Sequence, residues 1–310
     1  MPLPEEPAAA ASSPPRGGGF FYGGQAVIEG VMMRGRNHYA VAVRVPSTGE
    51  IRVKRGELSS GLYTSRFWKL PFLRGLALLA EQLHLGMKSL MWSAGVNAGD
   101  QEIEIGKREI AASMAVALTF TMVLFIGLPL LGAGFAVRRS GSIWFVVVEG
   151  VIRVALVLGY LWLIAMLRDV RRVFQYHGAE HKTINAYESG WRLELPWVRR
   201  ASTLHPRCGT GFLLVVVVVS VLLFSLVAVF HPNWFWLIVS RLLGVPVIAG
   251  LSYELIRFLA KHRDNPVVAV LLLPVLYTQK FTTREPEDEM LEVAIVAFNT
   301  AREGEEARAA

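Results

Sequence analysis

The chain has 310 residues, of which 53% are hydrophobic and 18% charged, and its mean hydropathy is +0.41. This composition excludes an ordinary soluble protein and indicates an integral membrane protein. A net charge of +7 would favour nucleic acid as the partner of a soluble chain. In a membrane protein, however, basic residues gather in cytoplasmic loops, so the charge indicates contact with a lipid bilayer and argues against nucleic acid. The single cysteine, Cys208, excludes an intrachain disulfide.

The N-terminal part is predicted to be a disordered leader followed by a small β module. Residues 1–19 are rich in Pro, Ala and Gly and have no apolar core, so they do not form a signal peptide. Within residues 20–64, alternation at 39–45 and 50–54 predicts two strands, and Gly49 suits the turn between them. A lone hairpin is marginally stable, so we expect it to pack on the helical part.

The same module begins with a glycine-rich stretch that carries Gln25, Glu29 and Arg34. These residues either belong to the functional site or form turns and a surface salt bridge. Residues 65–98 follow, in which polar residues interrupt the apolar ones too often for a membrane span. We interpret this segment as an interfacial amphipathic helix, with His84 on its polar face.

Four apolar runs are long enough to cross a hydrocarbon core of about 30 Å. They cover residues 110–132, 143–167, 211–230 and 234–260, and the last is expected to kink or break near Gly244-Val-Pro246. Residues 266–277 are too short to span and contain Pro274, which predicts a short apolar or re-entrant segment. The predicted fold is therefore a mainly α-helical integral membrane protein with about four transmembrane helices and a small N-terminal cytoplasmic β module.

Four crossings place the β module, the 168–207 connection and a C-terminal helix at 284–303 on one side of the membrane. That helix begins after Pro286 with three acidic residues in its first turn, and we expect it to be a docking helix that closes the cytoplasmic domain. Basic residues are concentrated on the same side: Lys107, Arg108, Arg168, Arg171, Arg172, Lys182, Arg192, Arg199, Arg200, Arg207, Lys261 and Arg263. The opposite side carries Arg138 and Arg139. The positive-inside rule therefore predicts that both termini are cytoplasmic.

Three charged residues lie deep inside the predicted spans. Glu149 and Arg153 are one helical turn apart in the second span, and Arg241 lies at a similar depth in the fourth. Charges at this depth are costly and normally paired, so we expect Glu149 to form a structural pair with Arg153 or Arg241. A proton or ion path is the alternative.

The 168–207 connection contains an H-x-x-E-H motif formed by His177, Glu180 and His181. On a helix the two imidazoles project from one face and can share a divalent metal, most simply zinc, while Glu180 exchanges a proton with water. The alternative is that these are polar residues on a hydrated helix face.

Three further residues bring possible ligands to the same side of the membrane. His205 and Cys208 precede the third span, and Glu254 lies near the cytoplasmic end of the fourth. His177, His181 and Glu254 would leave one coordination position open for catalysis, whereas completion by His205 and Cys208 would give a closed, structural site. Cys208 as a nucleophile activated by a histidine is a third possibility.

Four sequence stretches resemble the bacterial DUF1385 family of the YqhQ type: residues 23–34, 176–182 and 205–210, and the dipeptide Glu285-Pro286. The likeness covers about residues 20–300. It implies a multi-pass protein of the bacterial inner (cytoplasmic) membrane, and members are loosely described as predicted metal-dependent enzymes.

These observations lead to two functional hypotheses. The first is metal-dependent hydrolysis, at the cytoplasmic membrane face, of a membrane-associated protein or of a peptide or lipid-linked substrate. The second is a non-catalytic membrane scaffold or assembly factor with a structural metal. A transporter ranks below both, because paired broken helices and a polar midplane are lacking.

Overall fold

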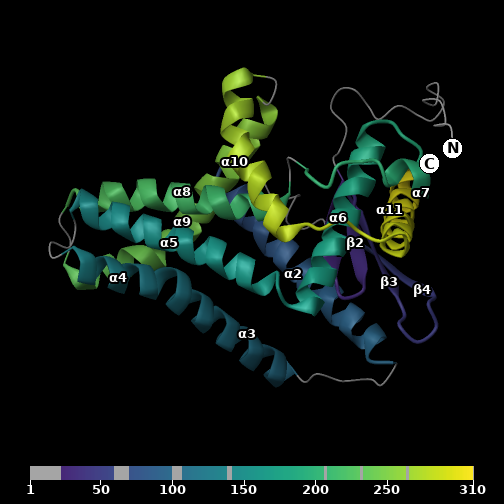
Figure 1. Ribbon diagram of the computed structural model, residues 1–310, viewed down its shortest axis with the longest axis horizontal. Helices are drawn as coiled ribbons and strands as arrows, with labels where there is room; N and C mark the ends of the chain where they lie inside the picture. Colours follow the sequence, from purple (N-terminus) through teal and green to yellow (C-terminus); the bar gives the residue numbers. More distant parts are fainter. Residues whose placement is uncertain are drawn as a thin grey trace.

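The computed structural model describes residues 22–58, 70–99, 107–137, 142–205, 208–230, 233–262 and 265–309. Long apolar helices form a bundle, and a sheet with its covering helices lies at one end of that bundle (Figure 1). The leader predicted at residues 1–19 lies outside the described residues.

The β module is a four-stranded antiparallel sheet in the order β1-β2-β3-β4. Its strands are β1 (Gly23–Val27), β2 (Gly30–Arg34), β3 (His38–Arg44) and β4 (Ile51–Glu57). The two predicted strands are β3 and β4, and Gly49 between them has the positive φ of 74° that its turn requires. The glycine-rich stretch before them forms β1 and β2, which the sequence interpretation missed. All five residues of β2 are buried, so it shows no alternation of polar and apolar residues.

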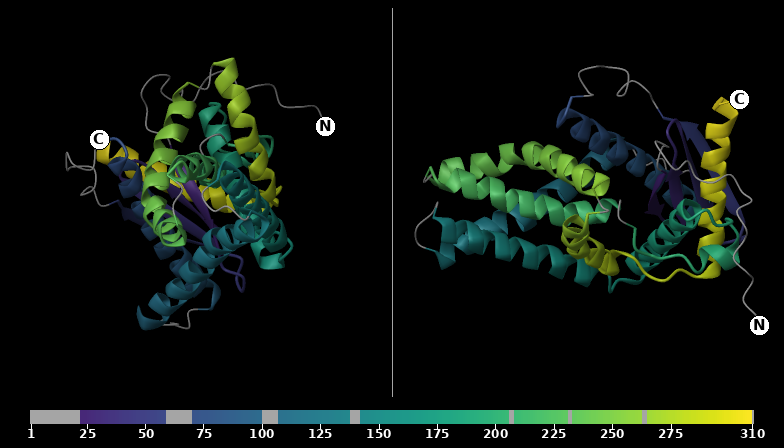
Figure 2. Two further views of the ribbon diagram at one scale, coloured as in Figure 1. Left: turned by 90° about the vertical axis from the view of Figure 1, so that its left-hand side faces the viewer. Right: turned by 90° about the horizontal axis from the view of Figure 1, so that it is seen from above.

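Helices cover both faces of this sheet (Figure 2). On one face α6 (Arg168–Glu188) and α11 (Asp288–Ala309) pack with β2 and β3. Val31, Ala42, Ile184, Leu291 and Phe298 belong to the resulting core. On the other face Met32, Val41 and Val43 pack with Leu85 and Val96 of α2 (Leu73–Asn97). Alternate residues of each central strand therefore serve two separate cores.

Among the described residues, four helices are long and apolar enough to cross a membrane, as predicted: Ala111–Ala136, Ile143–Ile164, Gly209–Val227 and Trp234–Leu259. The first consists of α3 (Lys107–Met122), a π-helical turn (Val123–Gly127) and α4 (Leu128–Ala136). The others are α5 (Ile143–Ile164), α8 (Gly209–Ala228) and α9 (Trp234–Lys261). Of the kink or break expected near Gly244-Val-Pro246, the break is absent, because α9 is continuous through Pro246; the kink stays a prediction.

The segment after α9 is a helix, α10 (Pro266–Thr282), which continues beyond the predicted residues 266–277. It stands at the junction of the bundle and the sheet and runs across the direction of the bundle helices (Figures 1 and 2). The short helix α7 (Leu195–Val198) lies between α6 and α8 in sequence and packs on α6 and α11.

Glu149 and Arg153 of α5 and Arg241 of α9 form a buried cluster inside the bundle. Glu149 accepts hydrogen bonds from Arg153 at 2.7 Å and from Arg241 at 2.5 Å. Arg153 also donates to Ser220 Oγ of α8 at 2.9 Å and to the Phe125 carbonyl of the π-helical turn at 3.0 Å. The cluster therefore joins the first span to α5, α8 and α9, as polar groups inside a membrane protein commonly do.

Candidate metal centre

The H-x-x-E-H motif lies in the buried C-terminal half of α6, where this helix meets both the sheet and α10. His177 and His181 are one turn apart, and their ring centroids are 4.4 Å apart. His181 and Glu180 are almost fully buried, at 1% and 4% exposure. The motif is therefore not on a hydrated helix face, which was the alternative to a functional role.

Backbone carbonyls fix the orientation of both imidazoles. His177 Nδ1 lies 2.7 Å from the Thr282 carbonyl at the end of α10, and His181 Nδ1 lies 2.5 Å from the Thr203 carbonyl. Because a carbonyl oxygen can only accept, each Nδ1 carries the proton and donates it. Each Nε2 is then the ring nitrogen left to bind a metal, and that of His177 faces Cys208. Histidines that bind metals are typically held in this way.

Cys208 supplies the third donor atom. Its Sγ lies 3.2 Å from His177 Nε2, and single donor atoms of His177, His181 and Cys208 all lie within 4.8 Å of one another. Ligands placed ~2.0–2.3 Å from one zinc ion are separated by similar distances. The thiol is also the N-cap of α8 and accepts from the Thr210 N–H group at 3.4 Å. The positive end of the helix dipole therefore favours a negatively charged ligand here.

Glu180 stands beside these donors. Its Oε2 is 3.5 Å from His181 Nε2 and 3.9 Å from His177 Nε2. Burial raises the pKa of Glu180 above its usual value, although neighbouring imidazoles and the N–H group of Gly24 act in the opposite direction. The carboxylate is thus close enough either to bind the same ion or to exchange a proton with a water next to it.

Gly24 of β1 allows the sheet to approach this carboxylate. A Cβ atom on residue 24 would lie 2.5 Å from Glu180 Cγ and 2.8 Å from Oε1. A side chain there would displace Glu180, so only glycine fits. The Gly23-Gly24 pair signalled a close approach or a turn, but the sequence could not tell which group lies opposite. Gln25 of the same stretch contacts the helix α2 at Gly86.

His205 lies next to the three donors without being one of them. Its ring centroid is 5.6 Å from that of His181, and its Nε2 is 3.6 Å from Glu188 Oε2. Gln279 of α10 holds its backbone by accepting from the N–H group at 2.9 Å and donating to the carbonyl at 2.7 Å. These two hydrogen bonds join the backbone of His205 to α10.

Glu254, an expected ligand, does not lie with the three donor atoms. Its carboxylate accepts hydrogen bonds from both Nε and Nη2 of Arg74 and from the Phe72 N–H group. The residue lies at the expected end of α9, but α2 packs against that end and occupies both carboxylate oxygens. Among the further ligands expected, Cys208 is the one whose donor atom lies close to those of His177 and His181.

Side chains of α6 also hold the connection that carries Thr203 and His205. Lys182 Nζ donates to the Arg199 carbonyl at 2.7 Å, and Asn185 Nδ2 donates to the carbonyls of Ser202 at 2.7 Å and Leu204 at 3.0 Å. Lys182 also pairs with Glu285 Oε1 at 2.5 Å. The sequence interpretation assigned Lys182 and Asn185 no role at the site, yet they follow the motif on the same helix and lie on buried turns.

The fold and this centre define a multi-helix protein with candidate membrane spans and a His-His-Cys group that could hold a metal at one end of the bundle. The model of family DUF1385, described as a protein of unknown function, matches residues 70–304, and the chain belongs to this family. It is 34% identical over 295 residues to "Uncharacterized protein YqhQ" of Bacillus subtilis (strain 168), covering 89% of this chain and 91% of that protein. No solved structure matches the chain. These comparisons name no metal and no activity.

Proposed function

We propose that the protein is a zinc-dependent hydrolase that acts at the membrane face where α6 meets the bundle, on a peptide or lipid-linked substrate. One observation carries this proposal. The Nδ1 atoms of His177 and His181 are bound to carbonyls, so both Nε2 atoms are available together with Cys208 Sγ, and the Glu180 carboxylate lies beside them.

The donor set suits zinc, which binds imidazole and thiolate ligands. Three protein ligands leave a fourth position open, as catalytic zinc sites require. Zinc held by these residues would supply Lewis-acid activation of water and of the substrate's carbonyl or phosphoryl group.

The chain's own contribution to the reaction is a proton relay at Glu180. Its carboxylate takes one proton from the attacking water, whose oxygen bonds to the carbonyl carbon or the phosphorus atom. Glu180 then gives this proton to the leaving oxygen or nitrogen as its bond breaks. The net change is the addition of one water across the cleaved bond, and Glu180 returns to its starting state.

The cytoplasm is the compartment that we assign to this face. The connection between α5 and α8 contains Arg168, Arg171 and Arg172 in the first turns of α6, next to the bundle. Such clusters remain on the cytoplasmic side of bacterial membranes. Metal-dependent chemistry with a cysteine ligand also suits a reducing compartment.

A structural metal in a non-catalytic scaffold is the second candidate. The almost complete burial of Glu180 and the hydrogen bond it receives from Gly24 favour it. Glu180 could then occupy the fourth position and close the coordination shell.

Metal content and complementation separate the two candidates. The detergent-purified wild type should contain stoichiometric zinc, and His177→Ala and His181→Ala should lose it together with thermal stability, because a ligand is removed. Glu180→Gln should keep zinc and the melting temperature, but its activity should fall by roughly 10²–10⁴-fold through loss of the proton acceptor, so a deletion strain is not complemented. His84→Ala, which alters an exposed histidine of α2, should behave as wild type.

Each result has one interpretation. Full complementation by Glu180→Gln, with His181→Ala inactive, would replace the hydrolase by the scaffold. Loss of zinc in Glu180→Gln would make Glu180 a ligand and would also support the scaffold. Wild-type protein without bound metal would overturn both candidates.

A further inference from the structure

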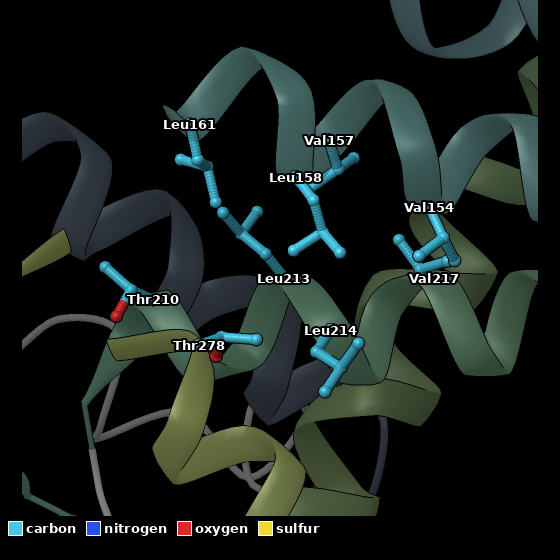
Figure 3. Close-up of a pocket in the computed structure, with 9 residues that line it drawn as sticks. All are labelled: Val154, Val157, Leu158, Leu161, Thr210, Leu213, Leu214, Val217 and Thr278. Atoms are coloured by element: carbon cyan, nitrogen blue, oxygen red, sulfur yellow. The ribbon is translucent and has the colours of Figure 1, made fainter. Parts of the chain in front are cut away.

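An apolar groove lies between α5, α8 and α10 (Figure 3). Leu158 and Leu161 of α5 and Leu213 and Leu214 of α8 line it, together with Thr278 of α10. The space between its walls is about 310 Å³ with the open side included, and the centres of water-sized spheres fit in only about 20 Å³ of it. It is therefore a shallow, open groove along the helices.

The walls of this groove suit hydrocarbon. Apart from Thr210 and Thr278, which lie together at one end, all of its lining residues are Val or Leu (Figure 3). The Thr278 hydroxyl is already used, because it donates to the Val275 carbonyl of its own helix at 2.8 Å. A peptide backbone in the groove would leave its N–H and C=O groups without partners, at a high cost in free energy.

The groove is continuous with the metal centre through Thr210. Thr210 Oγ1 lies 3.1 Å from Cys208 Sγ and 3.2 Å from the Thr282 hydroxyl that donates to it. Thr282 in turn supplies the carbonyl that orients His177. A molecule lying in the groove would therefore have one end next to the three donor atoms.

We infer that this groove binds one hydrocarbon chain of a lipid-linked substrate and places the bond nearest its head group at the His177, His181 and Cys208 centre. The inference rests on the proposed hydrolase and selects lipid-linked over peptide substrates. The groove follows α8 from Thr210 to Val217, a distance of roughly 10 Å at 1.5 Å per residue. It therefore holds the part of the chain nearest the head group, and the remainder extends into the bilayer.

Photocrosslinking in nanodiscs tests this assignment with the full chain. The probe is a phosphatidylethanolamine with a diazirine on one acyl chain, and the readout is the crosslink yield at residues 210–217 divided by that at residues 218–228 of the same helix. Leu158→Trp fills the groove and should lower this ratio roughly tenfold, because the added ring occupies the space of the chain. The control is Leu163→Trp, on the same helix but outside the groove and 60% exposed, which should leave the ratio unchanged.

Leu161→Trp, nearer to Thr210, provides a second groove variant if Leu158→Trp does not fold, as judged by melting temperature. Equal ratios in the folded groove variants and in Leu163→Trp would overturn the inference. Zinc content, measured in the same samples, should be unchanged in all three. If the wild type crosslinks in the groove but contains no zinc, the zinc-dependent function is refuted while lipid binding in the groove stands. If it contains zinc but does not crosslink in the groove, lipid binding is refuted while the proposed hydrolase stands.

Discussion

Two backbone carbonyls determine which nitrogen of each motif histidine is available. Thr282 is 105 residues from His177 in sequence, and Thr203 is 22 residues from His181. With Nδ1 engaged, Nε2 is the ligand atom in both rings. Spacing alone predicted that the two imidazoles share a face, but no pattern in the sequence could predict carbonyls that arrive from other elements.

The structure brings some of the predicted ligands together and not others, because some of their positions follow from local helix geometry and others from tertiary packing. His177 and His181 follow from helical periodicity, which is local. The position of Cys208 depends on the connection between α6 and α8, which α6 side chains bind at Arg199, Ser202 and Leu204. The partner of the Glu254 carboxylate depends instead on which helix packs against the end of α9. Arg74 of α2 provides that contact, and the sequence interpretation had placed α2 in the lipid headgroup layer. That membrane contact of α2 stays a prediction.

Glu305 is a carboxylate whose pH dependence can be measured. It accepts from the N–H groups of Asn37 and His38 at 2.5 and 2.8 Å and so holds the turn between β2 and β3 against α11. Burial alone would raise the pKa of Glu305, but these hydrogen bonds lower it below its ordinary value of 4.5. Its stabilisation is therefore complete above about pH 4.5 and is lost as the pH falls through the lower pKa of the folded state.

Glu305→Gln should accordingly lower the melting temperature at pH 7, with a loss of about 1.5–3 kcal/mol for hydrogen bonds to a charged group. The difference from wild type should shrink below about pH 4.5. His38 Nδ1 faces the same carboxylate at 3.8 Å, so the scan should also be run with His38→Gln. Glu303→Gln, which alters an exposed neighbour in α11, is the control. A deficit of Glu305→Gln that stays constant down to pH 3 would contradict the assignment.

At the scale of elements, helices were easier to predict than strands. Length and hydropathy predicted the four candidate spans, and the acidic first turn predicted α11. The sequence did not predict β1 and β2. β2 is covered by α6 and α11 on one face and by α2 on the other, so its residues do not alternate between polar and apolar. A strand buried on both faces resembles any short apolar run, and only the tertiary structure distinguishes them.

Gly178 determines how closely α6 can approach the segment that joins α10 to α11. A Cβ atom there would collide with the Arg284 carbonyl, and Arg284 N–H donates to the Phe174 carbonyl of α6 at 2.9 Å. Gly178→Ala should therefore push this segment away, carry the Thr282 carbonyl with it and cost about 1–3 kcal/mol. Zinc affinity should fall as well, by roughly 10–100-fold, because His177 loses its orienting partner.

Gly95→Ala provides the matched control for this prediction. Gly95 lies inside α2, and a Cβ atom there meets nothing within 4 Å. Alanine should therefore be neutral or stabilise the helix by up to about 1 kcal/mol. Melting temperature and zinc titration of both variants test the prediction. Equal melting temperatures and equal zinc affinities in the two variants would show that the close contact at Gly178 does not position the Thr282 carbonyl.

At the scale of the whole molecule, packing restricts the number of membrane crossings. The sheet precedes the first span, α6 lies between the second and third, and α11 follows α10, yet Val31, Ile184 and Leu291 belong to one core. These three parts must share one side of the membrane, so an even number of crossings separates each pair. Four spans satisfy this condition only if α10 does not cross. Its orientation across the bundle agrees with that (Figure 1).

Topology reporters test this arrangement. A reporter inserted near Gly190, after α6, and another fused after Arg308 should both indicate the cytoplasm, because the segments that they follow share one core and carry the basic residues. A third near Gly141, between α4 and α5, should indicate the opposite side. Removing residues 266–282 tests α10 separately: because we predict that this helix is not a crossing, we expect the Arg308 reporter to stay cytoplasmic. Opposite signals at Gly190 and Arg308 in the intact chain would require a fifth crossing and would separate α11 from the sheet against which it packs.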